Sequence, residues 1–198
     1  MPTSARASSR PTAVVHPESS AKILKKSVQQ AYTIYGFPAP PADHPDQEAL
    51  DLLAVLLGDG RNARLVHTLR EEKKLVWSVG ASNITQEGAG IFAIFAECDV
   101  RNRPSLGRAV RDVLQSLRKN PPSAEEIRRA KNLMQTSWLQ GYETFHNQAA
   151  TVGAYALDRQ LQRLERYLPN VLALGPRELN RVIRTYFSQE LREAVVEP

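Results

Sequence analysis

Four histidines and one cysteine are the side chains of this 198-residue chain most able to hold a metal ion or to act as a nucleophile. The strings H-E-x-x-H and H-x-x-E-H, which set two imidazoles on one helical face around a metal, do not occur. His67 with Glu71 and Glu143 with His146 have helical spacing, but a zinc site needs at least three protein ligands. We therefore expect no metal and no other cofactor in this chain, and we interpret His67 as a surface or capping residue.

The cysteine, Cys98, lies between two acids, Glu97 and Asp99. Neighbouring negative charge raises the pKa of a thiol and so disfavours the thiolate that a nucleophile needs. The serine elbow G-x-S-x-G is also missing from the sequence. We predict that Cys98 is a packed strand residue and that the chain has no catalytic residue of its own.

A glycine-rich segment, Gly58-Asp-Gly60-Arg-Asn-Ala63, matches the dinucleotide-binding string G-x-G-x-x-A. That motif binds a pyrophosphate only where it follows a strand and opens a helix. Here it follows apolar sequence of helix length, and the acidic residue expected about 20 positions later is missing. We interpret the segment as a turn between helices, in which glycines adopt positive φ.

Composition and charge place the chain among ordinary globular proteins, with 42% hydrophobic and 24% charged residues. No apolar run approaches the length of a membrane span, and no apolar segment typical of a signal peptide is present. The net charge is +5, but most of the excess lies in residues 1–26, so a basic nucleic-acid face on the folded body is not expected. The sequence does not decide the cellular compartment, which would be the periplasm or the cytoplasm if the protein is bacterial.

The domain organisation follows from the same patterning. Residues 1–27 are rich in Ser, Pro and Ala and are expected to be a flexible basic linker or leader, with order beginning near Ser27. Residues 28–198 are expected to form one α+β domain. In it, a mixed or antiparallel sheet carries amphipathic helices packed mainly on one face.

Apolar periodicity predicts the individual elements of that domain. Strand alternation over 75–81 places Leu75, Trp77, Val79 and Ala81 on one face. The string Ser123-Ala-Glu-Glu126 is a capping box that opens a helix. The expected elements are, in order, strand 30–37, loop 38–45, helix 46–57, helix 62–74, paired strands 75–81 and 91–96 with a turn at 86–90, an amphipathic helix with its apolar stripe over 106–117, helices starting at 124, 147 (to 161) and 176, and strand 191–196.

Two consecutive segments resemble a known family of peptidases. They are Leu57-Gly-Asp-Gly-Arg-Asn-Ala-Arg-Leu65 and Leu69-Arg-Glu-Glu-Lys-Lys-Leu-Val-Trp-Ser-Val-Gly-Ala-Ser82. They are similar to the glycine-rich loop and following segment of the pitrilysin–insulinase family of zinc peptidases, roughly L-G-G-G-x-S-S-R-L and then L-R-E-x-x-G-L-x-Y-S-V. Further matches occur in the family's order at 30–37, 44–50 and 122–132, so the resemblance covers about residues 28–197.

Members of that family are built from two similar α+β halves, in one chain or two, that enclose a chamber. One half carries the inverted zinc motif H-x-x-E-H, and the other is metal-free. Without that motif, this chain resembles the metal-free half. The resemblance implies a peptide or unfolded protein as substrate, an active partner half in the same longer chain or a separate subunit, and zinc bound in that partner.

The resemblance also implies which residues contact the substrate. In the family, an Arg and a Tyr after the glycine-rich loop bond the substrate backbone near the scissile bond. Arg70 matches the Arg, whereas Trp77 stands where the Tyr usually is and Val76 replaces a small residue. Gly58 and Gly60 would allow close approach. We expect the peptide to add as a strand to an exposed sheet edge, since main-chain bonds accept any sequence.

Alternatives remain open at this point. Arg70 would pair with Glu71 or Glu72 at the surface and Trp77 would pack in the core if neither contacts a substrate. A separate alternative for the whole chain is a structural pseudopeptidase subunit that holds a larger complex together without handling peptide. A nucleic-acid-binding module that uses the basic leader is a further alternative.

Overall fold

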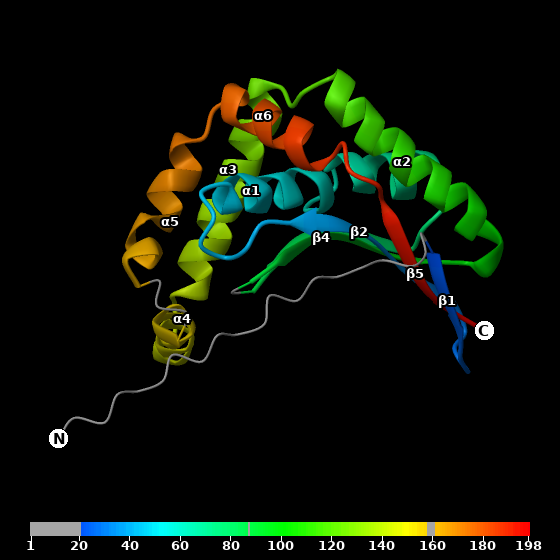
Figure 1. The fold of residues 1–198 in the computed structure, drawn as a ribbon, viewed down its shortest axis with the longest axis horizontal. Coiled ribbons are helices and arrows are strands. Elements are labelled where there is room, and N and C mark those ends of the chain that lie inside the picture. Colours follow the sequence, from blue (N-terminus) through cyan, green and yellow to red (C-terminus); the bar gives the residue numbers. More distant parts are fainter. Residues whose placement is uncertain (1–20, 87, 158–160) are drawn as a thin grey trace.

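A five-stranded sheet runs through the molecule, and most helices lie above one of its faces (Figure 1). The computed structural model describes residues 21–86, 88–157 and 161–198. The strands are β1 (Ala21–Lys25), β2 (Ala31–Ala39), β3 (Ser78–Thr85), β4 (Gly90–Cys98) and β5 (Arg192–Glu197). The helices are α1 (Gln47–Gly58), the π-helix η1 (Val66–Glu72), the short 3-10 helix η2 (Val100–Asn102), α2 (Arg103–Lys119), α3 (Ala124–Gly141), α4 (Phe145–Leu157), α5 (Leu161–Ala173) and α6 (Pro176–Tyr186). This arrangement confirms the predicted α+β class.

The strand order is β1-β5-β2-β4-β3, so β1 and β3 form the two edges of the sheet. β1 runs parallel to β5, and the other three pairs are antiparallel, which confirms the mixed sheet. The predicted hairpin is also confirmed, because β3 pairs with β4 from Ser78 opposite Glu97 to Thr85 opposite Gly90. Its predicted turn at 86–90 includes residue 87, which lies outside the described residues.

Regular structure begins earlier than the predicted start near Ser27, so that expectation is wrong. β1 occupies residues 21–25, where a linker was expected, and each of its residues has a partner in β5. The stabilising contact comes from the far end of the chain, which local composition cannot reveal. The first 20 residues of the predicted linker lie outside the part of the chain that the structure describes.

β2 continues through Pro38 to Ala39 rather than ending at Phe37 as predicted. A proline has no amide hydrogen to donate, so it is tolerated only where a strand lacks a neighbour on one side. β5 borders β2 only from Tyr32 to Gly36, so Pro38 lies past the end of that ladder. The proline therefore marks where the sheet narrows.

The hydrophobic core lies between the sheet and the helices that cover it. Phe37 of β2 stacks on Phe92 of β4 at 5.2 Å between ring centres, and the edge of Phe187 packs against both. The predicted apolar stripe of α2 is buried along its whole length. The largest fully buried side chains are Tyr35, Leu50, Leu52, Leu53, Leu57, Leu65, Leu69, Phe92, Ile94, Leu106, Leu117 and Leu179.

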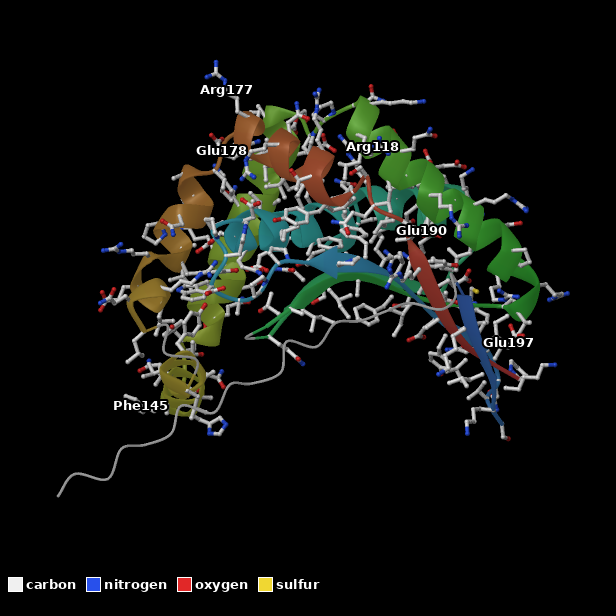
Figure 2. All side chains as sticks on the ribbon, in the orientation of Figure 1. Arg118, Phe145, Arg177, Glu178, Glu190 and Glu197 are labelled. Atoms are coloured by element: carbon white, nitrogen blue, oxygen red, sulfur yellow. The ribbon has the colours of Figure 1, made fainter. Side chains whose placement is uncertain are left out.

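The helix predicted over 147–161 is confirmed up to Leu157 as α4, and positions 158–160 lie outside the described residues. The following helix, α5, is not among the predicted elements, because it contains Pro169 and buries only Val171 fully. No residue of α4 is buried. Phe145, at its start, is 89% exposed and lies away from the sheet (Figure 2).

The face of the sheet opposite the helices carries exposed apolar side chains. Tyr32 and Ile34 of β2 are each 43% exposed, and Phe95 of β4 is 39% exposed. The register sets Ile34, Phe95 and Gly80 side by side across three strands. No helix within the described ranges is long and apolar enough to cross a membrane.

Candidate functional site

Arg70, the first residue expected to contact substrate, lies in η1 and bonds a carboxylate of its own chain. Its Nε and Nη2 donate to Glu71 Oε1 at 3.1 and 3.0 Å, and Arg61 Nη2 lies 3.4 Å from the other oxygen of Glu71. These bonds hold the pKa of Glu71 below its ordinary value, with the hydrogen bond from Arg70 as the main cause. The Arg70 side chain is 41% exposed, so the pair lies at the surface.

Trp77 lies one residue before β3 and is 57% exposed. The predicted strand 75–81 therefore starts too early, and the alternative that places Trp77 in the core is wrong. The reason is a turn after η1, in which Lys74 has a φ of +50° and the Leu75 amide donates to Leu69 at 2.9 Å. Because the strand begins only at Ser78, Val76 takes the buried position at 6% exposure.

The backbone of Trp77 is nevertheless fixed to the sheet. Its amide donates to the carbonyl of Glu97 in β4 at 2.9 Å. The indole is thus held beside the beginning of the edge strand while its ring stays in solvent. Arg70 and Trp77 therefore flank the short turn that leads from η1 into β3.

The two glycines of the predicted site have different structural roles. A Cβ on Gly58 would lie 2.2 Å from the backbone nitrogen of Ala81, so the end of α1 touches β3 directly. This packing accounts for a glycine at position 58 without any ligand. Gly60 has a φ of +81°, which confirms the predicted turn with positive φ at that residue.

The edge strand β3 is bordered by two hollows, which we name the open-face hollow and the helix-side slot. The open-face hollow has a volume of about 360 Å³ and lies on the apolar face opposite the helices. It is lined by Tyr32, Thr33, Ile34, Ser78, Val79, Gly80, Phe95, Ala96 and Glu97.

The helix-side slot also has a volume of about 360 Å³ and lies between β3 and the helices. It is lined by Asp51, Ala54, Val55, Gly58, Asp59, Gly80, Ala81, Ser82, Asn83, Met134 and Tyr167. Gly80 borders both hollows, so β3 separates them. An extended segment laid along this edge would have room for side chains on both sides of the sheet.

Behind the slot, two acidic residues at the start of α1, Asp46 and Glu48, form ion pairs with arginines of α6 and α5. We name these contacts the polar clasp. Arg163 Nη2 donates to Glu48 Oε2 at 2.8 Å and its Nε to Oε1 at 3.1 Å. Arg181 pairs with both oxygens of Asp46, and the Tyr186 hydroxyl donates to Asp46 at 3.0 Å. The bond from Arg181 holds the pKa of Asp46 below its ordinary value. Sequence reasoning treated these acids only as a helix start.

Asp51, one turn further along α1, has a different environment. Its carboxylate accepts hydrogen bonds from Asn83 Nδ2 and from the Tyr167 hydroxyl, each at 2.8 Å. Burial raises the pKa of this carboxyl, although both hydrogen bonds act in the opposite direction. Sequence reasoning missed Asp51, Asn83 and Tyr167. The only available signal was the spacing of Arg163, Tyr167 and Asn170, which places them on one face of a helix.

The remaining candidate residues have structural environments. His67 Nδ1 lies 3.5 Å from Glu72 Oε1 rather than beside Glu71, because a π-helix brings residues five apart together. Its side chain is 53% exposed, which confirms a surface histidine. Cys98 is fully buried in β4, and burial raises its thiol pKa to about 11. Within the described ranges, no group of three or more His, Cys, Asp or Glu side chains could hold a metal ion.

The chain also matches a known protein family. The model of the peptidase M16 inactive domain matches residues 3–134, two thirds of the chain. Zinc protease PqqE of Helicobacter pylori is 26% identical over 177 residues, which cover 89% of this chain and 38% of that relative. The chain spans about two fifths of the length of the curated relatives it matches.

Solved structures show the same fold. A protease from Helicobacter pylori superposes with a TM-score of 0.83 at 24% identity, over 90% of this chain and 44% of that chain. The inactive peptidase domain of a Bordetella parapertussis protein superposes with a TM-score of 0.79 at 22% identity, over 88% of this chain and 96% of that one. The matched part is less than half of the first solved chain and nearly all of the second.

Proposed function

The chain belongs to the peptidase M16 inactive-domain family, and from this premise we propose that it is the metal-free half of a two-part zinc peptidase. In this proposal the chain holds an extended peptide or unfolded protein and closes the chamber against a half that carries H-x-x-E-H. Zinc is bound by that partner half. Within the described ranges, no group of three or more His, Cys, Asp or Glu side chains could hold a metal ion, which supports placing the zinc in the partner half.

The observation that carries the proposal is the edge strand β3. It has no charged residue, it ends the sheet, and a hollow lies on each of its two sides. An edge strand offers backbone donors and acceptors to another strand, and such bonds do not depend on the side chains of the added peptide. This suits a protein that must hold many different sequences in extended form.

Arg70 and Trp77 are proposed to contact the peptide backbone where it passes the beginning of β3. The bonds to Glu71 use Nε and Nη2 of Arg70, so Nη1 is the donor best placed for a peptide carbonyl. The exposed indole of Trp77 supplies an N–H donor and a flat apolar surface. Gly60 permits the turn that leads into η1, and Gly58 lets α1 support β3 from behind.

Binding of a dye-labelled unstructured peptide to the 198-residue chain, followed by fluorescence anisotropy, tests this proposal. We expect binding without cleavage, and we expect Arg70→Ala to weaken it about tenfold, equivalent to ~1.4 kcal/mol. Arg108→Ala is the matched control, because Arg108 is an exposed arginine on α2 that bonds a neighbouring side chain. Equal binding by Arg70→Ala and the unmodified chain would remove Arg70 from the site.

Two observations favour a second candidate, a structural pseudopeptidase that assembles with other subunits without handling peptide. Arg70 already bonds Glu71 through two of its nitrogens, and Gly58 is required by internal packing. This candidate predicts no peptide binding by the chain. Co-purification separates the two further: the first proposal expects a complex that contains an H-x-x-E-H half and cleaves peptide, whereas the second expects a complex without that half.

A further inference from the structure

The helix-side slot has walls that match one type of side chain. Val55 of α1 and Met134 of α3 give it apolar surface, and the acidic residues Asp51 and Asp59 line the same volume. Within the described residues, no arginine or lysine lines it. A side chain with an aliphatic stem and a cationic head would bury its stem and bring its charge to the carboxylates.

Asp51 differs from the acids of the polar clasp in having no cation bonded to it. Asp46 and Glu48 are each paired with an arginine, whereas Asp51 has two neutral donors, Asn83 and Tyr167. The nearby guanidinium of Arg163 is engaged with Glu48. A carboxylate that is partly buried without a bonded cation is costly to keep, and a charged ligand would reduce that cost.

Asn83 supplies an independent observation. Its Nδ2 donates to Asp51 and to Gln47, but its Oδ1 is buried and accepts no hydrogen bond from any described residue. Buried amide oxygens are almost always paired, so this acceptor, on a residue that lines the slot, lacks the donor expected for it. An ammonium or guanidinium group carries several donors and no acceptor, which suits an orphan oxygen next to a carboxylate.

A strand added to β3 would direct alternate side chains to the two sides of the sheet. One set would face the apolar open-face hollow and the other would face the helix-side slot. We propose that the slot binds a lysine or arginine side chain of the bound peptide and so selects substrates with a basic residue at that position. This inference rests on the proposed function, because it requires a peptide on β3.

Pairs of labelled peptides that differ only by lysine or norleucine at one position test the proposal on the unmodified 198-residue chain. Norleucine keeps the stem and removes the ammonium group. We expect lysine to bind about tenfold more tightly at one position, or at alternate positions, as the peptide is scanned. We expect added salt to reduce that preference.

The Asp51→Asn variant tests whether the carboxylate of Asp51 is the group that recognises the lysine. We expect it to lower binding of the lysine peptide to the level of the norleucine peptide, while Asp112→Asn, an exposed acid on α2, leaves the preference intact. The variant should fold, since it removes a charge that burial disfavours, and thermal melting checks this. If folding fails, the peptide pair on the unmodified chain still decides the question.

The outcomes separate this inference from the proposed function. Equal binding of lysine and norleucine peptides at every position, with Arg70→Ala still weakening both, would overturn the slot and leave the proposed function standing. A lysine preference that survives in folded Asp51→Asn would place the recognition elsewhere. Failure of the chain to bind any peptide would contradict the proposed function and the slot together.

Discussion

The two edges of the sheet meet solvent in different ways. β1 has the sequence Ala-Lys-Ile-Leu-Lys, whereas β3 has Ser-Val-Gly-Ala-Ser-Asn-Ile-Thr. Lysines on an edge strand oppose pairing with another strand, because pairing would bury or crowd their charges. Apolar residues alone do not distinguish the edges, since Ile23 of β1 and Ile84 of β3 are each 45% exposed. The difference lies in charge and in the space beside the strand.

Under the proposed function, this difference favours β3 over β1 as the edge that accepts a peptide. β3 has a hollow on each side and a contact with α1 that fixes its position from behind. Near β1, Arg103 of α2 forms an ion pair with Glu197 of β5, with Nε 3.1 Å from the carboxylate, and its Nη1 lies 3.6 Å from Glu193. Figure 2 shows Glu197 at the end of the sheet where β1 and β5 lie together. The β1 side of the sheet is therefore charged, whereas the edge strand β3 carries only uncharged residues.

The largest effect is expected at the polar clasp, which holds α5 and the slot residue Tyr167 beside α1. Arg163→Ala leaves the Glu48 carboxylate buried without its cation, so the free energy of unfolding should fall by about 3 kcal/mol. Urea denaturation measures it. Arg166→Ala, an exposed neighbour on α5, should change little. An Arg163→Ala protein as stable as Arg166→Ala would show that the clasp does not hold the β3 side together.

The contact behind β3 gives the next effect. Gly58→Ala forces α1 and β3 apart, because the new Cβ would meet backbone at 2.2 Å, and should cost about 2 kcal/mol of unfolding free energy. Gly141→Ala, at the end of α3 where a Cβ meets nothing, serves as control and should stabilise slightly. Peptide affinity should fall with the first variant only. Retained stability in Gly58→Ala would mean that β3 is not fixed from behind.

A side chain that fills the open-face hollow should weaken peptide binding without lowering the stability of the fold. A Cβ on Gly80 meets nothing within 4 Å, so Gly80→Leu should fold normally while its side chain obstructs the hollow. We expect peptide binding to weaken about tenfold, or ~1.4 kcal/mol, with the unfolding free energy changed by less than about 0.5 kcal/mol. Gly153→Leu on α4 is the control. Unchanged affinity in Gly80→Leu would exclude this side of β3 from the binding surface.

A smaller effect is expected from the ion pair that holds the segment before η1 against α3. Arg64 Nε donates to Glu126 Oε1 at 2.7 Å and holds the pKa of Glu126 at about 2. A carboxyl group whose pKa is lower in the folded than in the unfolded state stabilises the fold at pH values above its unfolded pKa. This stabilisation is lost as the pH falls toward the folded pKa. Stability should therefore decline from about pH 4.5 toward about pH 2.

Glu126→Gln isolates this contribution, because glutamine keeps the capping box with Ser123 but cannot ionise. We expect the variant to lose about 1 kcal/mol at neutral pH and to depend less on pH in that range. Denaturation at several pH values measures both quantities. Parallel pH profiles for the variant and the unmodified chain would assign the acid sensitivity to other carboxylates, such as Asp46.

Much of the fold could be predicted from the sequence wherever a local pattern decides the structure. The stripe from Leu106 to Leu117 repeats at helical spacing, and the capping box at Ser123 satisfies its own helix end; both predictions are confirmed. β1 could not be predicted, because its stability comes from a partner strand far along the chain. Trp77 was predicted inside a strand over 75–81, whereas β3 begins one residue after it, beyond a turn in which Lys74 has a positive φ.

The candidate site was less accessible to sequence reasoning. Arg70 and Gly60 lie in a recognisable segment, and the turn at Gly60 follows from its type. Asp51, Asn83 and Tyr167 come from three distant segments that only the packing of α1, β3 and α5 brings together. No spacing in the sequence joins them, so the slot is visible only in three dimensions.

Hydrogen–deuterium exchange on the peptide-bound chain tests the central claim most directly, because it reports which backbone amides a bound strand protects. We predict that peptide slows exchange across Ser78–Thr85 in β3 and leaves exchange in Ala21–Lys25 of β1 unchanged. Bound peptide with no added protection in β3, or with protection in β1 instead, would contradict β3 as the substrate-binding edge.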